Sequence, residues 1–388
     1  MSKVSVHIVT FNSLPYLESM FRSLEHQAFR DFSVLVIDNA SKDGTVEWIE
    51  RYVEEHTPPF GHPSREGTSI DSPPWRGGRE ADGVGFNMRM VKNRENAGFA
   101  RAHNQAIHFT DSEYVLTLNP DVILHERFLE RLVQAMVANP RAGSASGKIL
   151  RAAGTPDELS ERTFTKTIDS AGIIADRKRF FRDRGAGEED RGQYDQSGQV
   201  GRISRTGRIG SDSVIGPSGA AAMYRREALV DAALKTQNSP PQYFDELYHS
   251  YKEDVDLAWR LQRRGWACVF VPGARAYHFR TLKASGEGIG KIAREYRARA
   301  PRLAFLSYRN HWYTLVKNEA GERMWKDLPW IAGWEFAKMV FLLFTRPGVV
   351  FRAWKDIIVN WRRLMERRNQ IQNSKSKTQN HGVPHGST

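Results

Sequence analysis

Residues 113–122 constrain the fold more than any other stretch of this chain of 388 residues. Their sequence is EYVLTLNPDV, in which an apolar run with high strand propensity, residues 114–118, stops at Asn119-Pro120-Asp121. A short run of this kind is typical of a strand buried on both faces of a sheet. Because proline cannot donate to a neighbouring strand, the strand ends there and Asp121 follows its carboxyl end.

Asp121 is therefore expected where open α/β sheets bind their ligands, at the carboxyl edge of the strands. A carboxylate in this place can hold a divalent cation, and the cation can hold a phosphate group. Asn-Pro-Asp is also a common turn sequence, so the motif alone leaves a structural turn as the alternative.

The chain before this strand alternates between strand-like runs and helical periodicity. The strand-like runs cover residues 4–10, 32–37 and 87–91, and the segments between the runs include amphipathic helices. This alternation predicts an α/β fold with a mostly parallel central sheet, right-handed crossovers and flanking helices. Asp38 follows the second run, so it should share a sheet edge with Asp121, although a cap or turn would explain Asp38 alone.

Two stretches interrupt this alternation. Residues 57–85 are rich in proline, glycine and charge, which predicts a mobile surface insertion. Residues 151–213 are polar with turns rich in glycine and aspartate, which predicts hairpins and loops.

A second acidic position comes from residues 252–265, whose apolar spacing predicts a helix. Glu253 and Asp254 lie in its first turn, where the helix dipole stabilises carboxylates, and that alone would explain them. His278 follows a strand-like run that contains Cys268. His278 should emerge at the same sheet edge, either as a metal ligand or as a structural histidine.

Composition places limits on the compartment and the partners. One cysteine excludes an internal disulfide framework and fits a reducing compartment. The N-terminus enters the first strand without the leader of a signal peptide, so we expect a cytoplasmic protein. The net charge is +12, and residues 346–388 carry nine Lys and Arg against two acids, which favours an anionic surface, membrane or nucleic acid.

The basic C-terminal segment has two parts. Residues 329–344 are aromatic and apolar, but the run is too short to span a bilayer and Glu335 and Lys338 interrupt it. The next residues predict a basic amphipathic helix that lies on an anionic membrane, or else docks on the domain. Its apolar face consists of Val350, Trp354, Ile357, Ile358, Trp361, Leu364 and Met365. Residues 369–388 are polar and expected to be disordered.

These blocks, in this order, resemble family 2 glycosyltransferases with the GT-A fold, a Rossmann-like mixed sheet, and bacterial rhamnosyltransferase-like members above all. The resemblance covers about residues 3–315. It implies a catalytic domain at 1–315, with 151–213 near the acceptor site, and an amphipathic helical extension at 316–368. The motifs that carry it are IVTFN (8–12), VIDNASKDG (36–44), ENAGF (95–99), LNPD (118–121), SGAAAMYR (218–225) and EDVDLAWR (253–260).

The resemblance implies a role for each motif residue. The donor nucleotide sugar would be bound by Thr10, Asn12, Asp38, Asn96, Gly98 and Asn119. The acceptor would be contacted by Gly219, Ala220 and Glu253. Asp121 would be the remaining acid of the family's Asp-x-Asp motif and would hold Mg²⁺ or Mn²⁺ together with His278. Asn119 replaces the first acid of that motif, which weakens the expected metal site.

Asp254 matches the family's general base, so the implied reaction is an inverting glycosyl transfer. The cation would neutralise the departing diphosphate, and Asp254 would take the proton of the acceptor hydroxyl. Glu253 would raise the pKa of Asp254 as a like-charge neighbour. We expect a dTDP-, UDP- or GDP-linked donor, with rhamnose as one candidate sugar. The expected acceptor is a glycan or lipid-linked glycan at the inner face of the cell membrane, and no nucleic acid partner is expected.

Two other functions compete with this interpretation. A sugar-phosphate nucleotidyltransferase would need a Gly- and Arg-rich loop after the first strand, where this chain has Phe11-Asn-Ser-Leu-Pro15. A non-enzymatic protein that binds a membrane or nucleic acid through its basic tail would tolerate the loss of Asp254. Its binding would fall steeply with salt.

Overall fold

The computed structural model describes residues 1–56, 86–154, 164–196, 200–201, 213–236, 239–279, 300–320 and 322–373. The expected insertion at 57–85 lies outside the described residues, as do parts of 151–213 and the end of the tail from residue 374.

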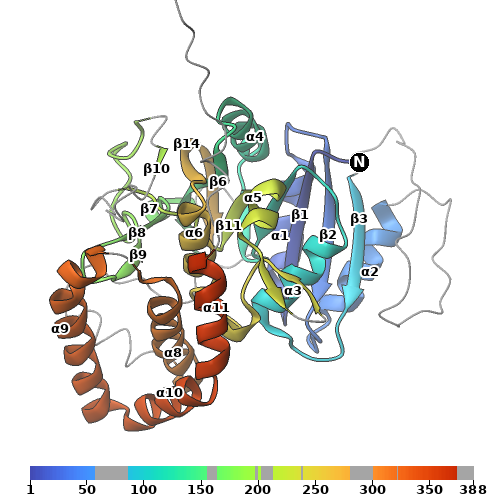
Figure 1. Cartoon of the computed structure of the whole chain (residues 1–388). Coiled ribbons are helices and arrows are strands. Elements are labelled where there is room, and N and C mark those ends of the chain that lie inside the picture. Colours follow the sequence, from blue (N-terminus) through green and yellow to red (C-terminus); the bar gives the residue numbers. More distant parts are fainter. Residues whose placement is uncertain are drawn as a thin grey trace, which may run out of the picture.

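The N-terminal half of the chain builds the parallel part of one sheet, with the strand order β3-β2-β1-β4. These strands alternate along the chain with helices, so the predicted α/β class is confirmed (Figure 1). The strands are β1 (Val4–Thr10), β2 (Phe32–Asp38), β3 (Asn87–Lys92) and β4 (Tyr114–Leu118). The helices are α1 (Leu14–Glu25), α2 (Thr45–His56) and α3 (Gly98–His108).

The other half of the sheet is mixed. Its order continues from β4 through β11, β6 and β14 to β10, and β11 runs antiparallel to both β4 and β6. β14 runs parallel to β6, and β5 and β7 pair with β14 and β6. These strands are β5 (Val122–Leu124), β6 (Ala142–Ala152), β7 (Phe164–Ser170), β10 (Val200–Gly201), β11 (Ala221–Arg225) and β14 (Ala267–His278). Two small hairpins join β8 (Ile173–Ala175) to β9 (Phe181–Asp183) and β12 (Leu234–Thr236) to β13 (Ser239–Gln242).

Helices cover both faces of the sheet. On one face α1, α2 and α4 (Phe128–Ala138) pack against alternate residues of β1, namely Val4, Val6 and Ile8. On the other face α3, α5 (Arg226–Ala232) and α6 (Glu253–Arg263) pack against Val115 and Tyr224. Burial on both faces explains why the strands read as nearly continuous apolar runs.

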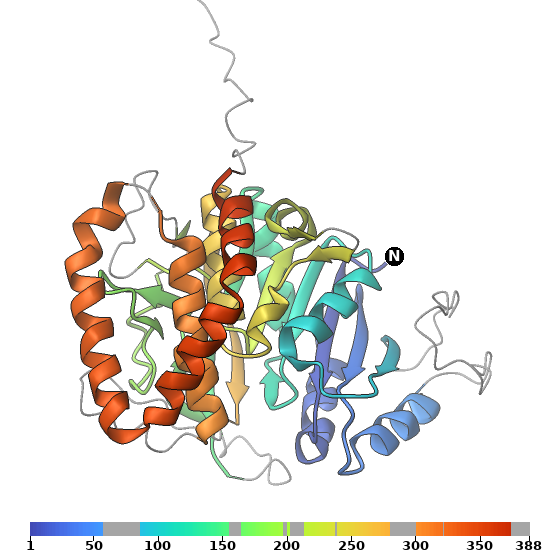
Figure 2. The same ribbon diagram turned by 60° about the horizontal axis from the view of Figure 1, so that its bottom comes forward.

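The C-terminal helices pack beside the mixed half of the sheet (Figures 1 and 2). They are α8 (Pro301–Asn318), α9 (Glu322–Thr345), α10 (Pro347–Val359) and α11 (Trp361–Asn373). The predicted amphipathic helix is divided between α10 and α11, and Val350, Ile357 and Leu364 of its apolar face are buried against α8. Of the two alternatives for these residues, docking on the domain is therefore the one observed. α11 continues through Asn373, into the segment that was expected to be disordered.

α9 is longer than the apolar run read from the sequence, so the expectation that this run is too short was wrong. Among the described residues, Met324–Thr345 is one segment long and apolar enough to cross a membrane, by length and composition alone. Glu335 and Lys338 lie inside it as a 2.6 Å ion pair, and Glu335 also lies 2.8 Å from His311 of α8. The buried contact between Glu335 and His311 joins α9 to α8.

A buried group of charges joins α8 to α6. Lys317 of α8 lies 2.5 Å from Asp245 and 2.9 Å from Asp256, and Asp256 lies 2.9 Å from Arg260. None of these four side chains is more than 2% exposed. Although burial opposes its ionisation, Lys317 and Arg260 hold the pKa of Asp256 well below its usual range. The paired charges therefore fix α8 against the first turn of α6.

Replacing Lys317 with methionine leaves Asp245 and Asp256 buried without their shared cation. We expect Lys317→Met to lower the free energy of unfolding by about 3–5 kcal/mol, measured by urea denaturation. Lys355→Met is the control, because Lys355 is exposed on α10 and its loss should change stability by less than about 0.5 kcal/mol. Equal small effects of the two substitutions would contradict a structural role for the buried charges.

Candidate active site

Thr10 and Asp38 end two neighbouring parallel strands and face each other. β1 and β2 pair in register at these residues, and the Thr10 hydroxyl donates to Asp38 Oδ1 at 2.8 Å. Asp38 is 1% exposed and also accepts from the backbone N–H and the hydroxyl of Ser41, at 2.9 and 2.6 Å. These contacts hold the carboxylate rigidly at the carboxyl end of β2.

Asn12 links the loops that follow β1 and β2. Its backbone is left-handed, with a φ of 51°. Its N–H donates to the Ser41 hydroxyl at 2.9 Å, and its Oδ1 accepts from the N–H of Lys42 at 2.8 Å. The side chain thus shapes the loops that surround Asp38.

Asn96 and Gly98 begin α3 at the same edge. Asn96 Oδ1 accepts from the Gly98 N–H at 3.0 Å, and Gly98 has a φ of +80°. A Cβ on Gly98 would lie 2.6 Å from the backbone oxygen of His249, so only glycine fits. Asn39 connects this turn to the strands, because it donates to the Gly98 oxygen at 3.4 Å and accepts from Asn93 at 2.9 Å. Sequence reasoning missed Asn39 and Asn93, although Asn39 directly follows a predicted site residue.

Asp121 lies in the turn after β4, beside the end of β14. Its Oδ2 is 3.2 Å from Nε2 of His278, and its backbone oxygen accepts from the Phe279 N–H at 2.9 Å. The other ring nitrogen of His278 lies 2.8 Å from Oδ2 of Asp169 in β7. Burial disfavours the imidazolium, but the two carboxylates raise the pKa of His278 to about 9. Asp169 was missed, because it is 109 residues from His278 and no local pattern connects them.

Asp121 and His278 are the two side chains at this edge that could hold one divalent cation, and they lie 3.2 Å apart. A carboxylate on the second ring nitrogen is the usual partner of a metal-bound histidine, and Asp169 provides it. No group of three or more His, Cys, Asp or Glu in the described residues is arranged to hold a metal. A bound ion would therefore need its remaining ligands from substrate and water.

Asp254 is held in the first turn of α6 by two backbone amides. The Gly219 N–H donates to its Oδ2 at 3.1 Å, and the Val255 N–H donates to its Oδ1 at 2.8 Å. Burial raises the pKa of Asp254, the two amides oppose the shift, and Asp183 of β9 adds to it by charge repulsion.

The segment before β11 connects Asp254 to the turn that carries Asp121. The backbone N–H of Asn119 donates to the oxygen of Ala220 at 2.9 Å, while the next residue back, Gly219, donates to Asp254. The structure therefore brings together the residues expected at the metal, at the acceptor and at the base.

Glu253 is buried beside Asp254 with fewer partners. It is 6% exposed, and its Oε2 has no hydrogen-bond partner among the described residues. Burial and the charge of Asp254 raise the pKa of Glu253 to about 8. The expected rise in the pKa of Asp254 is found, but burial is its main cause rather than the charge of Glu253.

Glu253 should make stability depend on pH. The carboxyl ionises near 4.5 when unfolded but keeps its proton to about 8 when folded, so the free energy of unfolding falls as pH rises through this interval. We expect Glu253→Gln to remove a slope of up to about 1.4 kcal/mol per pH unit, measured by urea denaturation between about pH 5 and pH 9. Glu227→Gln, exposed in the first turn of α5, should leave the slope in place. A slope that survives in Glu253→Gln would contradict this assignment.

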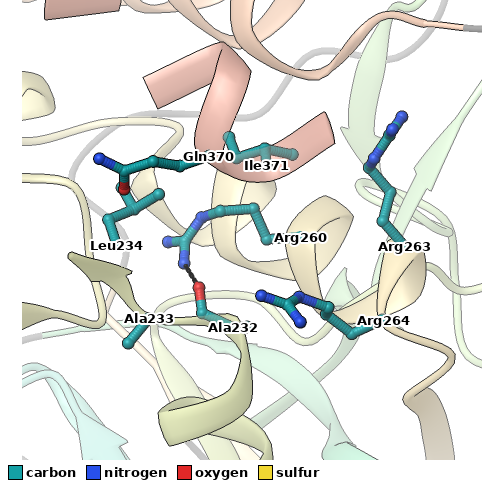
Figure 3. Close-up of a pocket in the computed structure, with 8 residues that line it drawn as sticks. All are labelled: Ala232, Ala233, Leu234, Arg260, Arg263, Arg264, Gln370 and Ile371. Carbon is teal, nitrogen blue, oxygen red and sulfur yellow. Dashed lines mark hydrogen bonds between the residues drawn. The ribbon is translucent and has the colours of Figure 1, made fainter. Parts of the chain in front are cut away.

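A small cavity lies away from this edge, between α6 and α11 (Figure 3). Its volume is about 20 Å³, which is room for a water molecule and not for a nucleotide sugar. Arg260 lines it but donates to the backbone oxygens of Ala232 and Tyr243, so this side chain serves the fold.

Comparisons with known proteins give the family of this chain. Residues 5–65 and 81–231 match the model of Glycosyl transferase family 2. The chain is 27% identical to the N-acetylglucosaminyl-diphospho-decaprenol L-rhamnosyltransferase of Mycobacterium tuberculosis. The alignment extends over 291 residues and covers 75% of this chain and 80% of that protein. It is 25% identical over 170 residues to a Bacillus subtilis protein provisionally named the teichuronic acid biosynthesis glycosyltransferase TuaG, 43% of this chain and 56% of that one.

Among solved structures, the chain is similar to GalNAc-T7 with UDP, GalNAc and Mn²⁺. The TM-score is 0.53 at 14% sequence identity, over 97% of this chain and 56% of that chain. This similarity concerns the fold, and the predicted GT-A fold is confirmed. The family match spans more than half of the chain and includes the segments that carry Asp38, Gly98 and Asp121. The chain therefore belongs to glycosyltransferase family 2.

Proposed function

We propose that this family 2 glycosyltransferase is inverting and metal-assisted, and moves a sugar from a nucleotide-sugar donor to a hydroxyl of a glycan or lipid-linked acceptor. One observation carries the proposal: a single segment, residues 219–220, joins the carboxylate of Asp254 to the turn that places Asp121 beside His278. A base and a cation site are thereby held in a fixed relation at the ligand-binding edge of the sheet.

Asp121 and His278 would hold Mg²⁺ or Mn²⁺, which supplies positive charge for the departing diphosphate. On the other side, Asp254 accepts the proton of the acceptor hydroxyl, and its raised pKa makes it a better base near neutral pH. A neutral Glu253 can donate a hydrogen bond to the acceptor, next to the backbone of Gly219 and Ala220. A single base on the face opposite the leaving group gives one displacement, and hence inversion at the anomeric carbon.

The donor nucleotide is assigned to the edge formed by Thr10, Asn12 and Asp38, with Asn96 and Gly98 at the start of α3 and Asn119 in the turn after β4. The mycobacterial relative is named as a rhamnosyltransferase that acts on a lipid diphosphate-linked N-acetylglucosamine. By this likeness we favour rhamnose, carried by dTDP rather than UDP or GDP, and a lipid-linked acceptor in polysaccharide biosynthesis at the cytoplasmic side of the membrane.

Nucleotide binding and sugar transfer test this assignment. Calorimetry with dTDP, UDP and GDP should show selective binding that Mn²⁺ strengthens, and Asp121→Ala should weaken the metal-dependent binding by about 10–100-fold. Asp254→Asn should bind the nucleotide normally but transfer the sugar about 10²–10⁴-fold more slowly. Asp231→Ala is the control. Asp231 also makes an ion pair and a hydrogen bond, but it lies on α5, which follows the last residue of β11 and so lies away from the proposed site.

Failure to bind any of the three nucleotides, with or without Mn²⁺, would contradict the proposed function. Normal transfer by Asp254→Asn would exclude Asp254 as the base. Retention of the anomeric configuration in the product, read by NMR, would exclude the single displacement.

We also propose that the C-terminal helices rest on the anionic inner face of the cell membrane, within residues 329–368. α9 lies on the outer side of these helices in both views (Figures 1 and 2). Large apolar side chains remain on the helix faces that point away from α8, and we call them the outer apolar residues: Phe336, Phe344, Phe351, Ile358, Val359 and Trp361, all at least 50% exposed. Exposed Arg352, Lys355, Arg362 and Arg363 lie between or beside them. Aromatic and aliphatic side chains beside basic ones suit an interfacial helix on anionic lipid.

Vesicle sedimentation tests this surface. The double variant Phe344→Glu, Ile358→Glu should lose most of its binding to vesicles of phosphatidylglycerol and phosphatidylcholine, since it puts charge among the outer apolar residues. Val230→Glu is the matched control, an exposed apolar residue on α5 that is 58% exposed. Wild-type binding of the double variant, or equal binding to vesicles of phosphatidylcholine alone, would contradict the proposed surface.

A further inference from the structure

The short turn between η3 (Glu246–Tyr248) and α6 is strained. Of the six non-glycine residues with positive φ in the described part of the chain, three lie here: His249 at 63°, Tyr251 at 72° and Lys252 at 68°. Side chains disfavour this conformation, so it persists only where the surroundings hold it, and such residues gather at functional sites.

His249 is the most unusual of the three. Its φ of 63° is combined with a ψ of −63°, and the N–H of Ser250 donates to the oxygen of Tyr248 at 2.7 Å. This is the geometry of the rare γ-turn with positive φ. Lys252 then takes a left-handed conformation directly before Glu253 and Asp254. The strain is thus concentrated in the residues that lead into the base.

The side chain of Asn310 in α8 binds the backbone of this turn. The side chain is fully buried, and its amide nitrogen lies within hydrogen-bonding distance of three backbone oxygens of the turn. The acceptors are the backbone oxygens of Tyr248, Ser250 and Tyr251, at 3.0, 2.7 and 2.8 Å. Arg309 orients the amide by donating to Asn310 Oδ1 at 2.9 Å, and also donates to the oxygens of Leu247 and Tyr248 at 3.0 and 3.1 Å.

The turn touches both sides of the active site. On one side the His249 oxygen accepts from the Ala100 N–H at 3.4 Å, and its ring lies against Gly98, where a Cβ would be 2.8 Å from Cγ. On the other side the turn continues into the first residues of α6. Whatever fixes the turn therefore fixes the distance between the start of α3 and Asp254.

We propose that Asn310 is a positioning residue for the base: its amide keeps the turn in the strained conformation that sets Asp254 relative to Gly98. The inference rests on the proposed function, because it takes Asp254 as the base and the start of α3 as the donor side. Asn310 lies outside the residues that match the family model, so this support comes from a part of the chain that the family match does not cover. A displacement of a catalytic group by about 1 Å can cost about 100-fold in rate.

Steady-state kinetics of Asn310→Ala test the proposal. We expect kcat to fall by about 100-fold, while Kd for the nucleotide with Mn²⁺ is unchanged because Thr10, Asp38 and Asp121 keep their places. The matched control is Asn318→Ala. Asn318 is also fully buried on α8 and donates to Asp256 at 2.8 Å and to the Thr314 oxygen at 3.1 Å, but it has no bond to the turn. Its loss should lower Tm as Asn310→Ala does and leave kcat near the wild-type value.

Two further measurements keep the test decisive. Asn310→Ser retains one donor and should fold with an intermediate loss of kcat. Hydrogen exchange in the absence of substrate should show faster exchange of the amides of residues 249–256 in Asn310→Ala and wild-type exchange there in Asn318→Ala. Unchanged exchange in both Asn310 variants, or equal loss of kcat in Asn310→Ala and Asn318→Ala, would overturn the positioning role. A wild-type protein that transfers no sugar would instead contradict the proposed function, and the exchange result would still decide whether Asn310 holds the turn.

Discussion

Lys317 supplies the positive charge on which the geometry around Asp254 depends. Its two carboxylate partners stand on either side of the active-site turn, because Asp245 caps η3 by accepting from the Leu247 N–H and Asp256 lies in the first turn of α6. Two buried carboxylates without a counter-charge would repel each other and open this region. The cluster therefore closes the segment that contains Asp254 and fixes α8 to α6.

The mixed topology of the sheet explains how distant motifs meet at one edge. Parallel pairing places the ends of β1 and β2 together, with Thr10 opposite Asp38. β11 runs the other way, so its first residue, Ala221, pairs with the last residue of β4 and brings the Gly219 segment to the turn after β4. β14 ends against β5, with His278 opposite Val122, which sets the imidazole beside Asp121. β11 and β14 thus bring the Gly219 segment, which holds Asp254, and the side chain of His278 to an edge built by parallel strands.

Sequence reasoning reached the parts of the site that local patterns encode. The places of Asp38 and Asp121 at the sheet edge were predicted because a strand that ends at a polar residue has a recognisable pattern, and parallel crossovers place such ends at one edge. Asp169, Asn310 and Lys317 were not found, because each acts on a partner more than fifty residues away along the chain. Amphipathic periodicity predicted the buried positions Val350, Ile357 and Leu364 of the tail correctly, but it placed the exposed Ile358 and Trp361 on the same face. It could not tell whether that face covers the domain or a lipid surface, because both partners are apolar.

The sequence by itself determined the α/β class, the strands that end in polar turns, and the family to which those ordered turns point. These follow from short-range rules of hydrogen bonding and side-chain periodicity. Only the tertiary structure decided that burial raises the pKa of both Glu253 and Asp254, and that the amides of Gly219 and Val255 oppose this rise at Asp254 alone. It also decided which apolar residues of the tail are buried. The pKa of a side chain and its exposure depend on residues that are distant in the sequence and become neighbours only on folding. A local stretch of sequence therefore cannot predict them.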